Sequence, residues 1–421
     1  MKKVLIITYL PYASPRIPAL AKYLPEFGWQ PVILTPAYPK EAEPELKVVE
    51  TPYQDSLRLI RRLLGIKADE DDLRKQAVER LAINPGNFFM EPLLNAAGAI
   101  VNYPDSKKGW KPLAISEGSK LLQDENIDAL ISSSSPVTSH IIASELKRRY
   151  KVPWLADLRD LWSQNHNYYY GPLRKLIDRR LELKTLAEAD ALATVSRPWA
   201  DKLGRLHEGK ATHIITNGFG PETMNTPPVD LTTKFTITYT GTIYTRKQNP
   251  AGLFAALKEL IADRAIDPNN IEVRFYGSET SWLNREVPKY GLSGIVRHYG
   301  LVSRQSAIEK QRESQLLLLL DWDDPQEKGV YPGKIFEYLA ASRPILATGG
   351  VAGNVVSKLL DETKAGIHAP TVPDIKDALK ELYHEYALNG KVGYQELEPE
   401  ISKYSYREIA REFAEILNHL V

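Results

Sequence analysis

The chain has 421 residues, of which 43% are hydrophobic and 25% charged, a composition that excludes a disordered or collagen-like protein. The 54 lysine and arginine residues nearly balance the 53 aspartate and glutamate residues, so the net charge of +1 predicts no nucleic-acid partner. The absence of cysteine excludes disulfides, zinc–thiolate sites and cysteine nucleophiles.

A βα pattern opens the sequence. Val4–Tyr9 is an apolar run that predicts a buried strand, Arg16–Phe27 has the apolar spacing of a helix, and Pro31–Thr35 predicts a second strand. We interpret residues 40–128 as helices and loops inserted at the open end of this domain. Beyond them we expect strands at Ala129–Ser132, Val152–Ala156 and Ala191–Val195, and helices at about Val137–Tyr150 and Leu173–Ala189.

A second βα series follows residues 217–233, whose glycine, proline and asparagine content is typical of a linker. Its expected strands are 235–241, Ile271–Gly277, Val296–Gly300, Gln315–Leu320 and Pro344–Thr348, with helices at Pro250–Ala262 and Lys334–Ala341. We therefore expect an α/β protein with two doubly wound, Rossmann-like parallel-sheet domains, 1–218 and 219–402, and a helix at about 403–421 that packs back on the first. Ligands of such sheets bind at the carboxyl ends of the strands, which predicts a cleft between the domains.

The sequence motifs limit the kinds of ligand site that the chain can contain. No G-x-G-x-x-G follows the first strand and no G-x-x-x-x-G-K-[ST] occurs, which argues against a dinucleotide site there and excludes a P-loop. The segment Lys328–Thr348 instead places Lys334 in the first turn of a helix, where the macrodipole disfavours a cation. A phosphate bound at the same place would account for this lysine, and an exposed ion pair with Glu337 is the alternative.

The motif K-x-x-E-Y-L-A-x-x-R-P-I-L in that segment resembles the nucleotide-sugar site of GT-B-fold glycosyltransferases of the family 4 type. Further segments resemble the family in the same order along almost the whole chain: Ala21–Thr35, Ser132–His140 with Val152–Trp162, Ala189–Ser196, Thr216–Phe219 and Tyr239–Tyr244. The resemblance implies an acceptor-binding N-terminal domain and a donor-binding C-terminal domain.

The resemblance also implies an activity. We expect transfer of a sugar, with retention, from a nucleotide-diphosphate sugar to a hydroxyl of a glycan or lipid-linked acceptor, in polysaccharide or cell-envelope glycan synthesis. No metal or other cofactor is expected. Two alternatives remain open, a nucleotide-sugar 2-epimerase of the same fold and a non-catalytic nucleotide-sugar-binding subunit.

We assign the donor site to Gly241, Thr242, Gly329, Tyr331, Gly333, Lys334 and Glu337, and the resemblance implies that Glu337 binds the ribose hydroxyls. Arg246 and Lys247 follow the strand that ends at Gly241, where similar enzymes place a basic residue on the diphosphate. Cations there stabilise the negative charge that develops on the leaving diphosphate, so both residues are assigned to catalysis. The alternative for each is a solvated surface charge.

Charged residues crowd the end of the strand before Trp162, which suits an active-site loop. We assign Arg159 and Asp160 to catalysis, and Arg16, Ser134, Ser135 and Asp157 to the acceptor side. A structural Arg–Asp network is the alternative, and Ser132–Ser135 is equally well a helix-capping turn. His140 is interpreted as a helix-face residue rather than a general base.

Two further features bear on the site. Asp321 and Asp323 mimic the metal-binding D-x-D of the unrelated GT-A fold, but the double βαβ organisation argues against a metal. Gly329 stands where many relatives carry a glutamate, and Arg159 where they carry a histidine. Because glycine offers only backbone groups and can adopt positive φ, we expect loop 329–333 to hold the sugar and phosphates through its backbone, while Arg159 and Asp160 orient the sugar or acceptor.

The sequence gives two indications of location. The first residues have no small-residue cleavage site, and no stretch approaches the roughly 18 apolar residues that a spanning helix needs. We therefore expect a cytoplasmic protein, with peripheral contact at the inner face of the membrane as an option. Asp55–Lys67 is a basic amphipathic stretch that suits such contact, and an ordinary docking helix is the favoured alternative.

Overall fold

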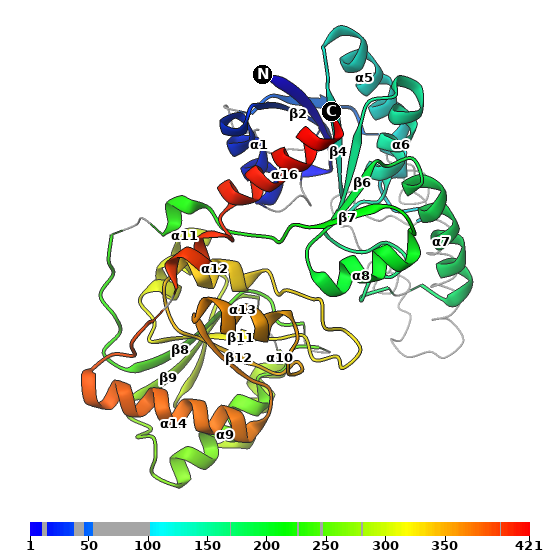
Figure 1. Ribbon diagram of the computed structural model, residues 1–421. Helices are drawn as coiled ribbons and strands as arrows, with labels where there is room; N and C mark the ends of the chain where they lie inside the picture. Colours follow the sequence, from blue (N-terminus) through cyan, green and yellow to red (C-terminus); the bar gives the residue numbers. More distant parts are fainter. Residues whose placement is uncertain are drawn as a thin grey trace. The chain divides into compact units, whose positions relative to one another are not determined.

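The computed structural model describes residues 1–10, 15–37, 46–53, 102–168, 170–224, 227–244, 247–278, 281–395 and 397–421. The chain forms two compact units, Met1–Ile215 with Ala410–Val421, and Thr216–Ile409 (Figure 1). Within the described ranges each unit contains one parallel sheet with helices packed against it, which confirms the expected pair of α/β domains.

The described part of the first unit contains a seven-stranded sheet in the order β3-β2-β1-β4-β5-β6-β7. Leu5 of the central β1 pairs in register with Val32 on one side and Leu130 on the other. Its strands are β1 Lys2–Ile7, β2 Trp29–Pro36, β3 Val48–Thr51, β4 Ala129–Ser134, β5 Trp154–Leu158, β6 Ala191–Thr194 and β7 Ala211–Ile214; its helices are α1 Arg16–Tyr23, α5 Lys111–Asp124, α6 Thr138–Tyr150, α7 Pro172–Leu186 and α8 Arg197–Leu206.

The described part of the second unit contains a six-stranded sheet in the order β10-β9-β8-β11-β12-β13. Its strands are β8 Phe235–Thr240, β9 Ile271–Tyr276, β10 Val296–Gly300, β11 Leu316–Leu320, β12 Ile345–Thr348 and β13 Gly366–Ala369. Its helices are α9 Ala251–Ala262, α10 Ser281–Glu286, α11 Arg304–Arg312, α12 Lys334–Ala340, α13 Val355–Thr363, α14 Val372–Asn389 and α15 Glu398–Ser402. In both sheets the strand order reverses beside the first strand, the place where such folds bind ligands at the carboxyl ends.

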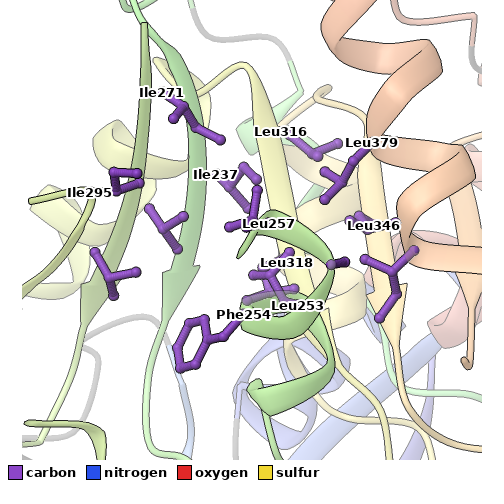
Figure 2. Close-up of a cluster of buried hydrophobic side chains, with 14 of the residues drawn as sticks. Ile237, Leu253, Phe254, Leu257, Ile271, Ile295, Leu316, Leu318, Leu346 and Leu379 are labelled. Carbon is purple, nitrogen blue, oxygen red and sulfur yellow. The ribbon is translucent and has the colours of Figure 1, made fainter. Parts of the chain in front are cut away.

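The five leucines of β11 show how the second sheet is covered on both faces. Leu316, Leu318 and Leu320 belong to the core cluster under α9 and α14. Figure 2 shows Leu379 of α14 beside Leu316, and Leu253 of α9 beside Leu318. The leucines in between, Leu317 and Leu319, belong to the cluster formed with α12 and α13. Because both faces are buried, the strand reads as a continuous apolar run rather than an alternation.

The last helix, α16 (Tyr406–Leu420), begins in the second unit and ends in the first. The guanidinium carbon of Arg16 lies 5.2 Å from the centroid of the Phe413 ring. Trp29 Nε1 donates a hydrogen bond to Asn418 Oδ1 at 3.2 Å. These contacts attach the C-terminus to α1 and β2.

The expected strands are present within about two residues of their predicted bounds, but β3, β7 and β13 were not predicted. All three have only four residues and are half-exposed, so no buried apolar run marks them. Since β3 lies within residues 40–128, the interpretation of that region as helices and loops alone is wrong. The amphipathic stretch Asp55–Lys67 lies outside the described residues. Among the helices described, none has the length and apolar content needed to cross a bilayer.

Candidate functional site

Gly241 follows directly after β8, and two other residues lie close to its backbone. Its φ is +111°, and its N–H donates to the Tyr276 carbonyl at 2.6 Å. A Cβ atom at Gly241 would lie 2.4 Å from Cε of Lys334, and one at Gly277 would lie 2.1 Å from the Gly241 carbonyl oxygen. The carboxyl ends of β8 and β9 therefore meet through glycines, and Lys334 lies against them.

Lys334 is the first residue of α12, and its Nζ lies 5.2 Å from the centroid of the Tyr239 ring. Burial lowers the pKa of this lysine below its ordinary value, and the nearby Glu337 carboxylate opposes that shift. In the part of the chain that the structure describes, no carboxylate pairs with the ammonium. A half-buried cation without a counter-ion suits an anionic ligand such as a diphosphate.

Hydroxyl groups lie beside this lysine site. Thr242 Oγ1 and Ser278 Oγ are 3.2 Å apart, and the Tyr239 hydroxyl donates to the Thr242 carbonyl at 2.8 Å. Gly241, Gly277 and Ser278 line a small pocket together with Tyr276 and His298. Ser278 and His298 were not predicted. A polar residue just after a buried parallel strand, such as Ser278 after β9, is a signal that the sequence offers, whereas His298 lies in the middle of the half-exposed β10 and carries no such signal.

Glu337 lies one turn along α12 from Lys334. Its side chain is 43% exposed, and its Oε1 is 3.8 Å from Arg304 of α11. The next residue, Tyr338, is fully buried, and its hydroxyl accepts the N–H of Thr240 at 3.1 Å. The hydrogen bond between Tyr338 and Thr240 fixes α12 against the end of β8. The Glu337 carboxylate on the same helix remains accessible to solvent.

The loop before α12 is only partly available to a ligand. Gly333 has φ −54°, and Gly329 is not among the positive-φ glycines, so the left-handed conformation that glycine allows is not used here. The N–H of Gly329 donates to Glu327 Oε1 at 3.0 Å. The Tyr331 ring lies 5.5 Å from that of Phe336 and packs against the α12–α13 cluster.

Lys247 forms an ion pair: its Nζ donates to Asp324 Oδ2 at 2.6 Å. Its charge is therefore partly neutralised in this structure. Arg246, the other cation expected here, lies outside the described residues.

Asp321 is buried and forms several polar contacts. It accepts hydrogen bonds from the Trp322 N–H and from Asn354 Nδ2, both at 2.7 Å, and His368 Nε2 is 3.3 Å away. Its neighbour Asp323 is exposed. Among the described residues, no three histidine or acidic side chains gather as a metal-ligand set. Asp321 thus connects the loops that follow β11 and β12 to strand β13, which contains His368.

In the first unit, a buried polar network lies at the ends of β4 and β5. Arg16 donates to Asp157 Oδ1 at 3.0 Å and to the Ile215 carbonyl at 3.1 Å, and the side chains of both Arg16 and Asp157 are 0% exposed. Ser133 Oγ donates to the other oxygen of Asp157 at 2.8 Å. Two residues assigned to the acceptor side, Arg16 and Asp157, are therefore buried supports of this sheet edge.

The network fixes Arg159. Its Nε donates to Ser133 Oγ at 3.0 Å and to the Ser134 carbonyl at 2.9 Å. Asp160 and Arg159 are half-buried, whereas Ser135 is exposed, so these three reach the surface at the carboxyl end of the sheet. Ser133, which the assignment passed over within the serine run, is the residue that connects Asp157 to Arg159.

His140 belongs to the same region but not to the surface. It is fully buried on α6, with Nδ1 2.7 Å from Ser132 Oγ, which also accepts a bond from Trp154 Nε1. Burial lowers its pKa to about 4; the charge of Asp157 opposes this shift and that of Arg159 adds to it. The imidazole is therefore neutral and enclosed, a poor position for a general base.

Comparison with known proteins identifies a family that matches part of the chain. Residues 13–220 match the glycosyl transferase 4-like domain family. No curated protein sequence matches the chain.

Solved structures share the architecture over the full length. Sucrose-phosphate synthase from Thermosynechococcus elongatus is similar with a TM-score of 0.63 and 14% identity, over 100% of this chain and 99% of that one. HepE from Anabaena, in complex with UDP and glucose, has a TM-score of 0.63 and 11% identity over 100% of both chains. The lipopolysaccharide outer core galactosyltransferase WaaB has a TM-score of 0.58 and 13% identity, over 99% of this chain and 100% of that one.

Proposed function

Residues 13–220 belong to the glycosyl transferase 4-like family and the chain is a GT-B-fold glycosyltransferase of the family 4 type, and from this premise we propose how it works. It transfers a sugar from a nucleotide-diphosphate sugar to a hydroxyl of a glycan or lipid-linked acceptor, with retention. The second unit binds the donor, and the first binds the acceptor. The product belongs to polysaccharide or cell-envelope glycan synthesis, on the cytoplasmic side of the membrane.

One observation carries the donor assignment: Lys334 is half-buried against Gly241 and has no counter-ion in the described residues. A donor diphosphate would supply the missing negative charge. As the sugar–phosphate bond breaks, the leaving diphosphate gains charge, and a cation already in place stabilises the transition state. HepE was solved with UDP and with UDP-glucose, which supports uridine nucleotides as the first donors to test.

The remaining donor contacts follow from the same edge of the sheet. The exposed Glu337 carboxylate is suited to accept hydrogen bonds from ribose hydroxyls. Thr242, Gly333 and those backbone groups of Gly329 and Tyr331 that are not already bonded complete the site; the Gly329 N–H is excluded, because it donates to Glu327. Lys247 reaches the diphosphate only if its ion pair with Asp324 opens, and Arg246 remains a second candidate for that role.

On the acceptor side, Arg159 and Asp160 orient the sugar or the acceptor hydroxyl, and Ser135 lines the same edge. Ser134, also assigned to the acceptor side, is 1% exposed and supports this edge from below. Because His140 is neutral and enclosed, we assign no side-chain base. An oxygen of the leaving phosphate takes the acceptor's proton, a route that needs neither a metal nor another cofactor.

The test has two stages. A thermal-shift screen of nucleotide diphosphates and their sugars identifies the donor, since a ligand that binds only the folded state raises its apparent stability. The selected donor is then incubated with and without glycan and lipid-linked acceptors, and products are separated by mass spectrometry. Sugar transfer supports the proposal. Epimerised donor in the absence of acceptor would instead identify a 2-epimerase, and binding without turnover on any acceptor would identify a binding subunit.

A further inference from the structure

Helix α7 exposes large apolar side chains to solvent. Leu173 is 72% exposed, Leu176 47%, Ile177 40% and Leu183 38%. The first three are spaced i, i+3 and i+4, so they lie on one face of the helix. An exposed apolar cluster of this kind marks an interaction surface more often than an ordinary helix surface.

The buried face of α7 is largely polar, the reverse of an ordinary surface helix, since Leu186 is the one apolar side chain among its five buried residues. Arg174 is buried, donates to Asp178 Oδ1 at 2.9 Å and to the Pro104 carbonyl at 2.9 Å, and lies over the ring of Tyr170. Glu182 is 0% exposed and accepts the Ser163 N–H at 3.0 Å. Inward-facing polar bonds therefore set the orientation of α7, and the outward leucines are not needed to hold it in place.

The same arrangement separates the charges of the helix. Both acidic residues, Asp178 and Glu182, are buried. Four basic residues are exposed: Lys175, Arg179, Arg180 and Lys184. The outer face of α7 thus combines four apolar side chains with four positive charges and no negative charge of its own.

We propose that the outer face of α7 binds the surface of a membrane that contains anionic lipids. Leucine and isoleucine enter the boundary between headgroups and acyl chains, and lysine and arginine extend along it to reach the phosphates. The all-positive charge of the face complements an anionic bilayer and favours it over a protein partner of mixed charge. This surface differs from residues 55–67 and does not depend on the transferase reaction.

The test measures co-sedimentation of the full chain with phosphatidylcholine vesicles, with and without phosphatidylglycerol, and without donor or acceptor. We expect binding only to the anionic vesicles, weakening as salt is added. The Arg179→Ala/Arg180→Ala variant removes two charges and is expected to bind about 30-fold more weakly. Leu173→Glu/Leu176→Glu should abolish binding, whereas Leu388→Glu, at a 70% exposed leucine of α14, should bind like the parent.

Because all the substituted side chains are exposed, the variants are expected to melt like the parent, which a circular-dichroism melt checks. Equal vesicle binding by the parent and Leu173→Glu/Leu176→Glu would overturn the proposal, as would no binding to anionic vesicles. Self-association that the same variant removes, measured by sedimentation velocity in the absence of lipid, would also overturn it by assigning the face to a second copy of the chain.

Discussion

The aliphatic chain of Lys334 lies directly on the backbone of Gly241, where a Cβ atom would come within 2.4 Å of Cε and 2.9 Å of Nζ. The glycine at the end of β8 thus sets the position of the lysine at the start of α12, 93 positions later in the sequence. Any side chain at 241 must displace the ammonium.

The first prediction uses this contact. Gly241→Ala should weaken nucleotide-diphosphate binding by about tenfold or more, because the methyl group moves Lys334 and also strains a residue with φ +111°. Gly291→Ala is the control, since Gly291 also has positive φ but no atom within 4 Å of its Cβ position. Calorimetric titration measures both, and equal affinity of the two variants would separate Gly241 from the donor site.

The second prediction concerns the buried pair of Arg16 and Asp157. Asp157→Ala leaves the Arg16 guanidinium buried without its carboxylate, and should lower the free energy of unfolding by about 3–5 kcal/mol. Lys289→Ala, which breaks an exposed pair with Glu286, should change it by less than about 0.5 kcal/mol. Urea denaturation measures both. A similar small change for the two variants would contradict the supporting role of Asp157.

The third prediction follows from the pKa of His140, which is lowered from 6.5 to about 4 by burial. The unfolded chain binds a proton here at higher pH than the folded one, so His140 favours folding fully above pH 6.5. That contribution is lost as the pH falls toward 4, by at most about 1.4 kcal/mol per pH unit. His140→Gln should therefore flatten the fall in stability between these pH values. Parallel curves for parent and variant, measured by urea denaturation at each pH, would refute this.

The fourth prediction tests Arg159, whose Nε is held by Ser133 and Ser134. Arg159→Ala should lower kcat by about a hundredfold or more, as loss of a preorganised charged donor does, and leave nucleotide binding nearly unchanged. Arg149→Ala, which removes an exposed arginine of α6, is the control and should retain parental turnover. A parental kcat for Arg159→Ala would remove this residue from the site.

How far the sequence predicts this molecule depends on the range of the interactions. Buried strands and the Lys334 motif are local patterns, and the structure contains them near the expected residues. The ion pair of Lys247 with Asp324 joins positions 77 residues apart, and no local pattern indicates it. The burial of Arg16 and Asp157 likewise depends on contacts across 141 residues.

The role of amphipathic residues is also difficult to predict from the sequence. Tyr331 suits a ligand site and an apolar cluster equally well by composition, and only the packing beside Phe336 distinguishes them. Short strands such as β13 also cannot be predicted from the sequence, because four half-exposed residues contain neither a buried apolar run nor a clear alternation of apolar and polar residues. Local chemistry thus predicts the edge of the sheet where the site lies, while the pairing of charges at that edge requires the fold.

The central claim is that Lys334 holds the donor diphosphate, and nucleotide titration of Lys334→Met tests it most directly. Methionine keeps the packing against Gly241 and removes the charge, so stability should be retained while the affinity for the bound nucleoside diphosphate falls about tenfold to a hundredfold. Lys358→Ala, at an exposed lysine of α13, should bind like the parent. Parental affinity in a folded Lys334→Met protein, measured by isothermal titration calorimetry with UDP and GDP, would contradict the account.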